Sequence, residues 1–312
     1  MADAREFVAV GGAMVDRYYD LSNLPEPDGG AFIRDERVGV GGIAGNLAST
    51  AARLGRETGL IARVGDDDRA DRIERDLAQR DIDTTRVRRG DGESTHSLVL
   101  RANGERMVVT GGDSAAALAL RDADRPYFQG AAVVAANAYL PERVTAPLVE
   151  MRETGALSLL SFDLSGPLSE LVGRGTTPGT IDRALAAADL VLVGEVAMDA
   201  YLAHHDASDP VALLREQGVE RGALTHGDDG ATLLAPDGTI AIDAFGVDTV
   251  DTTGAGDAFH AALVDAWLLA ERAPRAAGEF AAATAALNCT GDGARGGLPT
   301  REDVETLLAH RT

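Results

Sequence analysis

The second half of this chain alternates short, largely apolar segments with amphipathic ones. The apolar segments have the length of buried strands, and the amphipathic ones repeat apolar residues at helical spacing. The apolar segments are residues 131–135, 156–162, 190–193 and 222–225, and the amphipathic segments are 144–152, 181–188 and 211–217. Strands that are apolar at every position need cover on both faces. The pattern therefore predicts an α/β fold of three layers, with a mostly parallel central sheet between two layers of helices.

Two polar segments do not fit that sheet. Residues 14–40 carry turn residues such as Pro25 and are expected to be largely irregular, and residues 93–110 contain the hairpin signal Asn103-Gly104. We therefore predict a small β-sheet lid formed by 14–40 and 93–110. The remaining residues, 1–13, 41–92 and 111–312, would form one large α/β domain. The acidic run 66–68 is expected to be a solvated turn.

Composition excludes several classes of protein. The chain has 29 basic and 50 acidic residues, for a net charge of −21, and every basic residue is Arg. Without Lys there is no Walker A phosphate loop and no Schiff-base chemistry. The acidic charge argues against binding to nucleic acid, and no apolar run approaches the length of a membrane span. We expect a cytoplasmic protein, since no signal peptide is recognisable, and the acid excess suits the salt-rich cytosol of a halophile.

The segment from 250 to 259 carries the strongest chemical signal. Small residues lead into a helix, where free N–H groups and the helix dipole favour an anion. The N–H groups of Gly254, Ala255 and Gly256 would hold a transferring phosphoryl group, and Asp257 would act as general base for an acceptor hydroxyl. The alternative is an ordinary Gly-rich turn with an Asp at the first turn of the helix.

A second Gly-rich segment, Gly41 to Asn46, also precedes a predicted helix. It matches the loose dinucleotide-binding fingerprint, but that motif must follow a buried strand. The stretch before it, 34–37, consists only of Arg, Asp and Glu. We therefore interpret the segment as a hinge that brings Asn46 to a polar ligand.

Together these two segments resemble the ribokinase family, the PfkB-type carbohydrate kinases. Further matches are found, in the same order, at 65–67, 225–230 and 293–299. The resemblance implies a ribokinase-like α/β fold with a lid. It also implies ATP-dependent phosphorylation of a sugar hydroxyl, as in ribokinase, fructokinase or 2-keto-3-deoxygluconate kinase. ATP and Mg²⁺, with K⁺ in many members, are the cofactors that it implies.

The resemblance assigns roles to individual residues. The sugar-binding set is Asp16, Gly41, Gly42, Asn46 and Asp257, to which we add Asn137 after the strand at 131–135. The nucleotide-binding set is Glu195, Thr225, Gly227, Gly230, Gly254 and Gly256. The monovalent-cation set is Asp251 and Thr253, with the backbone of Asn288, Gly291, Gly293 and Gly297. Backbone carbonyl groups are suitable ligands for K⁺.

Two departures from the family pattern keep alternatives open. The Asn-x-x-Glu element that helps to organise Mg²⁺ is replaced by Gly194 to Ala197, with Glu195 as the acid that remains, and Ile43 stands where relatives often have a basic residue. The alternatives are a nucleoside or sugar-phosphate kinase and a non-catalytic binding protein. A phosphorylated substrate would need arginines of the lid segments, with Arg34, Arg37, Arg101 and Arg106 as candidates. Exposed lid strands would suit a homodimer.

Overall fold

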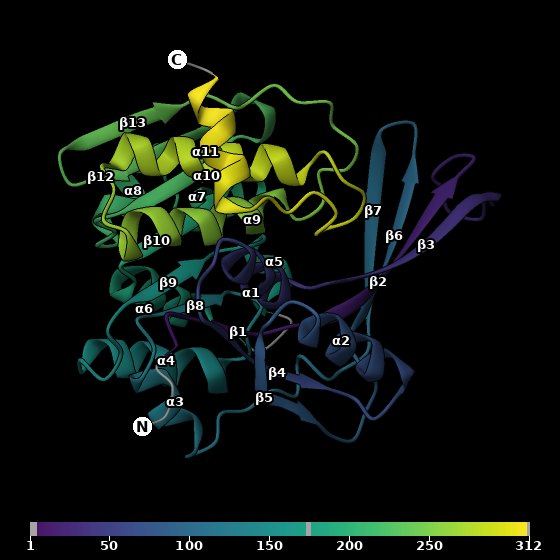
Figure 1. Cartoon of the computed structure of the whole chain (residues 1–312), viewed down its shortest axis with the longest axis horizontal. Helices are drawn as coiled ribbons and strands as arrows, with labels where there is room; N and C mark the ends of the chain where they lie inside the picture. Colours follow the sequence, from purple (N-terminus) through teal and green to yellow (C-terminus); the bar gives the residue numbers. More distant parts are fainter. Residues whose placement is uncertain (1–4, 173–175, 311–312) are drawn as a thin grey trace.

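The computed structural model describes residues 5–172 and 176–310 (Figure 1). Its strands form two sheets. The larger sheet contains β1 (Phe7–Val10), β4 (Thr58–Val64), β5 (Asp83–Arg89), β8 (Val133–Asn137), β9 (Leu160–Asp163), β10 (Leu190–Gly194), β11 (Gly222–Thr225), β12 (Ala231–Ala235) and β13 (Gly238–Ile242). The smaller sheet contains β2 (Met14–Leu21), β3 (Ile33–Gly41), β6 (His96–Ala102) and β7 (Glu105–Gly111).

The larger sheet has the strand order β13-β12-β11-β10-β9-β8-β1-β4-β5. Neighbouring strands of this sheet are parallel, except that β12 is antiparallel to both β11 and β13. Its central strands are buried on both faces; all four residues of β1 are fully buried. The prediction of a mostly parallel sheet between helical layers is confirmed.

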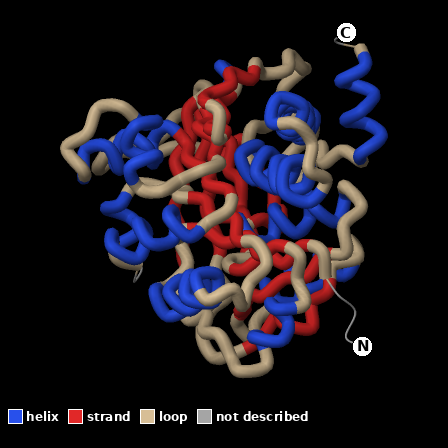
Figure 2. Tube along the Cα trace, turned by 90° about the vertical axis from the view of Figure 1, so that its left-hand side faces the viewer, coloured by secondary structure: helices blue, strands red, loops and turns tan. Residues whose placement is uncertain are grey.

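Helices cover both faces of this sheet (Figure 2). One layer consists of α1 (Ile43–Arg53), α2 (Asp68–Ala78), α9 (Ala255–Leu263), α10 (Pro274–Asn288) and α11 (Arg301–Ala309), and a π-helical segment, Val264–Leu269, continues α9. The other layer consists of α3 (Asp124–Gln129), α4 (Glu142–Glu153), α5 (Leu168–Val172), α6 (Pro178–Ala187), α7 (Glu195–His204) and α8 (Pro210–Glu216). Among the described residues, no helix is long and apolar enough to cross a membrane.

The smaller sheet extends from the body of the molecule in the strand order β3-β2-β6-β7 (Figure 1). Its strands come from 14–41 and 96–111, the two segments predicted to form a lid. The expectation that 14–40 is largely irregular is wrong, because β2 and β3 are strands of eight and nine residues. Polar side chains suit them because much of this sheet is open to solvent. The hairpin at Asn103-Gly104 is present between β6 and β7. We refer to this sheet as the lid.

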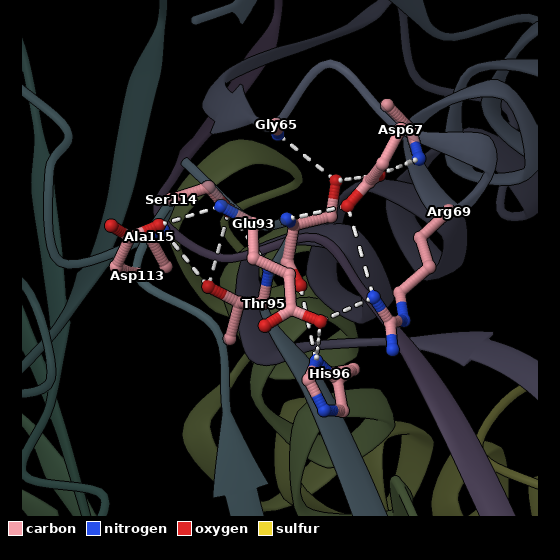
Figure 3. Close-up of polar contacts among 11 residues, drawn as sticks. Gly65, Asp67, Arg69, Glu93, Thr95, His96, Asp113, Ser114 and Ala115 are labelled. Atoms are coloured by element: carbon pink, nitrogen blue, oxygen red, sulfur yellow. Dashed lines mark hydrogen bonds and ion pairs between the residues drawn. The ribbon is translucent and has the colours of Figure 1, made fainter. Parts of the chain in front are cut away.

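Hydrogen bonds at its base attach the lid to the body (Figure 3). Asp67 caps α2 by accepting from the N–H of Ala70, and it also accepts from the N–H and the hydroxyl of Ser94. Ser94 in turn accepts from the N–H of Gly65. In the acidic run 66–68, Asp66 and Asp68 are exposed, as expected for a solvated turn, but Asp67 between them is not free. This middle residue joins a helix of the body to the segment that enters β6.

Candidate active site

The start of α9 has the form that the sequence predicts. Gly254 precedes the helix with a φ of 76°, and a side chain there would collide with the carbonyl oxygen of Ala294. Among the described residues, the N–H groups of Gly254 and Gly256 have no backbone acceptor. Ala255 differs from the prediction, because its N–H donates to the carbonyl of Thr252 at 3.2 Å. The helix start therefore leaves donors for an anion, but Ala255 does not provide one of them.

Asp257 lies in the first turn of α9, beside these donors. Its Oδ2 accepts a hydrogen bond of 2.7 Å from the Asn46 side chain on α1. Burial raises the pKa of Asp257 to about 7, and the negative charge of Asp163 acts in the same direction, while the Asn46 amide opposes both. A carboxylate with a pKa near neutrality is suited to accept a proton from a hydroxyl group.

Arg295 holds Asn46 in place. It donates to the Asn46 side-chain oxygen at 2.7 Å, to the Gly41 carbonyl at 3.0 Å and to Asp76 at 2.5 Å. Its side chain is 3% exposed. Since the Asn46 oxygen accepts from Arg295, its amide nitrogen must face Asp257. Sequence reasoning missed this residue; the signal was a lone Arg between small residues within the Gly-rich segment 291–297.

Asp16, on the lid strand β2, is the candidate sugar-binding residue of the lid. Ser97 on the neighbouring strand β6 donates to it at 2.5 Å, and burial raises its pKa. Gly41 lies so close that any side chain there would overlap the Asp16 carboxylate. Gly42 has a φ of 88° and approaches the Gly12 backbone. The predicted sugar-binding residues of the lid and of α1 are therefore assembled around one place.

Two further polar residues end neighbouring strands of the large sheet. Asn137 ends β8 and Asp163 ends β9, and the two are register partners. Asn137 accepts from the N–H of Tyr139 at 3.1 Å, and Asp163 accepts from Ser165. Burial raises the pKa of Asp163. Ligands of open parallel sheets bind at this edge, so Asp163, which sequence reasoning missed, is a candidate site residue.

Apart from Gly254 and Gly256 at the start of α9, the predicted nucleotide-binding residues form a second set beyond β10 and β11. Glu195 begins α7 and lies 3.4 Å from the His226 ring, next to Thr225 at the end of β11. Gly227 and Gly230 follow in a short turn with positive φ. Glu195, Thr225 and His226 line a cavity of about 400 Å³. Direct contacts between this set and Asp257 are absent from the described residues.

The predicted cation set is also assembled. Asp251 accepts from the N–H groups of Thr253 and Gly293, both at 2.9 Å, and from Arg101 of the lid at 2.5 Å. The Asn288 side chain donates to the carbonyls of Ala294 and Thr253 at 3.1 and 3.5 Å. Gly291 and Gly297 pack against the backbone of the same loop. The loop from 291 to 297 is therefore tied to both α9 and the lid.

The chain as a whole matches a known family. The model of the pfkB family of carbohydrate kinases matches residues 4–301. The chain belongs to this family. An ATP-dependent ribose-1-phosphate kinase of Halopiger xanaduensis is 33% identical over 293 residues, which cover 93% of this chain and 94% of the relative. A ribokinase of Bacillus subtilis is 29% identical over 311 residues, covering 98% and 100%.

Solved structures agree on the fold. A ribokinase of Arabidopsis thaliana, solved with ribose and ATP, has a TM-score of 0.83 at 22% identity and covers 98% of this chain and 99% of that one. A nucleoside kinase of Methanocaldococcus jannaschii has a TM-score of 0.81 at 20% identity and covers 98% of each chain. The predicted ribokinase-like fold is confirmed. The roles of single residues stay predictions.

Proposed function

We propose that this member of the pfkB family transfers the γ-phosphoryl group of ATP to a hydroxyl group of a sugar. The observation that carries the proposal is the position of Asp257, whose carboxylate lies at the N-terminus of α9 beside free N–H groups and is held by Asn46. A base and an anion site next to each other are what phosphoryl transfer to an alcohol requires, because such catalysis consists largely of positioning and charge stabilisation.

In the proposed reaction, Asp16 and Asn46 orient the sugar, with Asn137 as a further hydrogen-bonding group. Asp257 takes the proton of the attacking hydroxyl, and the N–H groups of Gly254 and Gly256 stabilise the charge that develops on the transferred group. The lid covers the site and excludes water, which would otherwise compete with the sugar.

Mg²⁺ would supply charge neutralisation on the phosphates of ATP. In the described part of the chain, no three His, Cys, Asp or Glu side chains gather as a metal site. Mg²⁺ in phosphoryl-transfer enzymes needs only one or two carboxylates besides the phosphates. Glu195, whose side chain is 63% exposed, is the acid that we propose for this contact. A solved relative of Escherichia coli contains ATP and Mg²⁺.

Ribose and ribose-1-phosphate are the first substrates to test. The Halopiger relative acts on ribose-1-phosphate according to its name, and the Bacillus relative on ribose. Of the four lid arginines considered for a phosphate, Arg37 contacts Asp20 and Asp292, and Arg101 contacts Asp251. Arg34 and Arg106 are exposed. Since two of the four are already paired, we place the unphosphorylated sugar first and ribose-1-phosphate second.

The test is ADP release from ATP with a panel of acceptors at high KCl: ribose, ribose-1-phosphate, fructose, 2-keto-3-deoxygluconate and nucleosides. We expect one acceptor class to support turnover, and Asp257→Asn to reduce turnover by about 10²-fold or more. Asp237→Asn, at the exposed turn between β12 and β13, is the matched control. A non-catalytic binding protein would release no ADP with any acceptor, and full activity of Asp257→Asn would refute the assignment of the base.

We also propose that two copies associate through their lids. Large apolar side chains are exposed on the lid: Phe32, Ile33, Met107, Val108 and Val109. Phe32 is 84% exposed. Such residues on the strands β3 and β7 at the two edges of a sheet are typical of interaction surfaces. Light scattering should give twice the mass of one chain, and Val109→Asp should lower the measured mass to that of a single chain.

A further inference from the structure

Arg101 connects the lid to the segment that leads into α9. It belongs to β6, and one guanidinium nitrogen lies 2.5 Å from Asp251 Oδ2 and 3.4 Å from the Thr253 hydroxyl. The guanidinium also lies over the Tyr18 ring of the lid, 4.7 Å from its centre. The side chains of Asp251 and Arg101 are 4% and 20% exposed. The pair is therefore an ordered, largely buried ion pair that joins residues 150 positions apart.

Asp251 needs a positive partner at this place. Its buried carboxylate accepts from the N–H groups of Thr253 and Gly293 and from the Arg101 guanidinium, and a buried carboxylate is costly unless a cation is paired with it. It lies three residues before Gly254, the first residue of the anion site. An unpaired buried carboxylate there would repel the phosphoryl group that the N–H groups attract.

The residues present do not fit a monovalent ion while Arg101 is in place. Oδ2 of Asp251 accepts from both Arg101 and Gly293, and Oδ1 accepts from the N–H of Thr253. The carbonyl groups of Thr253 and Ala294 accept from the Asn288 amide. An ion bound to the same carboxylate oxygen would also lie against a guanidinium of equal charge, and the repulsion between the two would oppose binding.

We propose that Arg101 is a positioning residue of the lid. It supplies the positive charge that the family resemblance would assign to K⁺. The charge around the anion site is then balanced only when the lid lies against the loop from 291 to 297. An enzyme built in this way needs no monovalent ion, and it couples closure of the lid over the sugar to completion of the anion site. Only the kinetic part of the test rests on the proposed kinase activity.

Thermal unfolding gives a test that is independent of activity. The full chain is melted in tetramethylammonium chloride, a salt whose cation is too large for a protein cation site, and K⁺ replaces part of it at constant ionic strength. We expect no K⁺-specific change in Tm for the unaltered chain. Arg101→Gln leaves the Asp251 carboxylate without its positively charged partner, so K⁺ should raise the Tm of this variant. Arg17→Gln, at an exposed arginine of the lid strand β2, is the control and should behave like the unaltered chain.

Turnover is measured in the same salts. Without K⁺, Arg101→Gln should lose on the order of tenfold in kcat, and K⁺ should restore it in a saturable manner. Arg101→Lys keeps the positive charge and should show no K⁺-specific response. If Arg101→Gln does not fold, the Lys variant still tests whether the charge at this position makes K⁺ unnecessary.

Three results would overturn the proposal: a K⁺ requirement in the unaltered chain, no effect of Arg101→Gln, or a loss in Arg101→Gln that K⁺ does not repair in either readout. If no acceptor supports turnover, the kinase proposal fails, whereas the Tm measurements still decide the role of Arg101.

Discussion

The hydrogen bond between Asn46 and Asp257 should be visible in the pH dependence of turnover. With a pKa of about 7, half of Asp257 is ionised at pH 7. Because only the ionised form accepts a proton, kcat/KM should fall about tenfold per pH unit below 7 and level off above pH 8. An unperturbed Asp would instead give a flat profile down to about pH 4.

Asn46→Ala removes the donor that favours the ionised carboxylate. A hydrogen bond to a charged group contributes about 1.5–3 kcal/mol, and one pKa unit corresponds to about 1.36 kcal/mol. The acid limb should therefore move up by about one to two pH units. At pH 7 this shift alone reduces the active fraction from about one half to about a tenth or less.

The assay is ADP release with the best acceptor between pH 5 and 9 at constant salt, with kcat/KM taken as the readout because it follows the free enzyme. Asn23→Ala, an exposed amide in the lid, is the control. If Asn46→Ala only removed a contact to the sugar, kcat/KM would fall by the same factor at every pH and the acid limb would not move. An unshifted limb in that variant, or a flat profile down to pH 4 in the unaltered chain, would refute the reasoning.

Three further variants test neighbouring contacts. The pKa of Asp257 is about 7 in the folded chain and near 4 in the unfolded chain, so the folded state loses stability as pH rises from about 4 to about 7. Asp257→Asn should therefore be more stable than the unaltered chain at pH 8, by about 2–4 kcal/mol in urea unfolding. At pH 4 the variant should be no more stable than the unaltered chain. Gly254→Ala requires a strained positive φ and collides with the Ala294 carbonyl, so we expect a loss of about 1–3 kcal/mol and a higher KM for ATP; an unchanged Tm would contradict this. Ser97→Ala removes the donor to Asp16 and should reduce kcat/KM for the sugar by about tenfold with little change in KM for ATP.

Features that depend on neighbouring residues could be predicted from the sequence. The start of α9 is a local property of small residues before an amphipathic segment, and Asp257 is placed by the same few residues. The capping box of α11 between Thr300 and Asp303 is of the same kind, and the structure contains it. The large sheet could be predicted because strands buried on both faces are apolar at every position.

Features that depend on distant residues could not be predicted in this way. The side chains of Asn46 and Asp257 are 211 positions apart, and those of Arg295 and Asn46 are 249 apart. No spacing rule relates such residues, and only the resemblance to a family placed Asn46 and Asp257 in one site. The strands β2 and β3 were missed for another reason: a sheet that is largely open to solvent does not show the apolar pattern of a buried one.

The site contains more acid than an enzyme for a triphosphate would be expected to tolerate. Four carboxyl groups lie in it or next to it: Asp16, Asp163, Asp251 and Asp257. Among the described residues, Arg101 pairs with one of them, Asp251, and the charge of Arg295 lowers the pKa of Asp16 and Asp257 without an ion pair to either. The two arginines differ in how firmly they are placed. Arg295 is held by Asn46 and Asp76 of the body and by the carbonyl of Gly41 at the end of β3, whereas Arg101 belongs to the lid strand β6. If the lid closes as proposed, one of the balancing charges comes and goes with it while the acidic groups stay, and the affinity of the anion site then depends on where the lid is. A site balanced in this way binds phosphate weakly when open, which limits transfer to water before the sugar is in place.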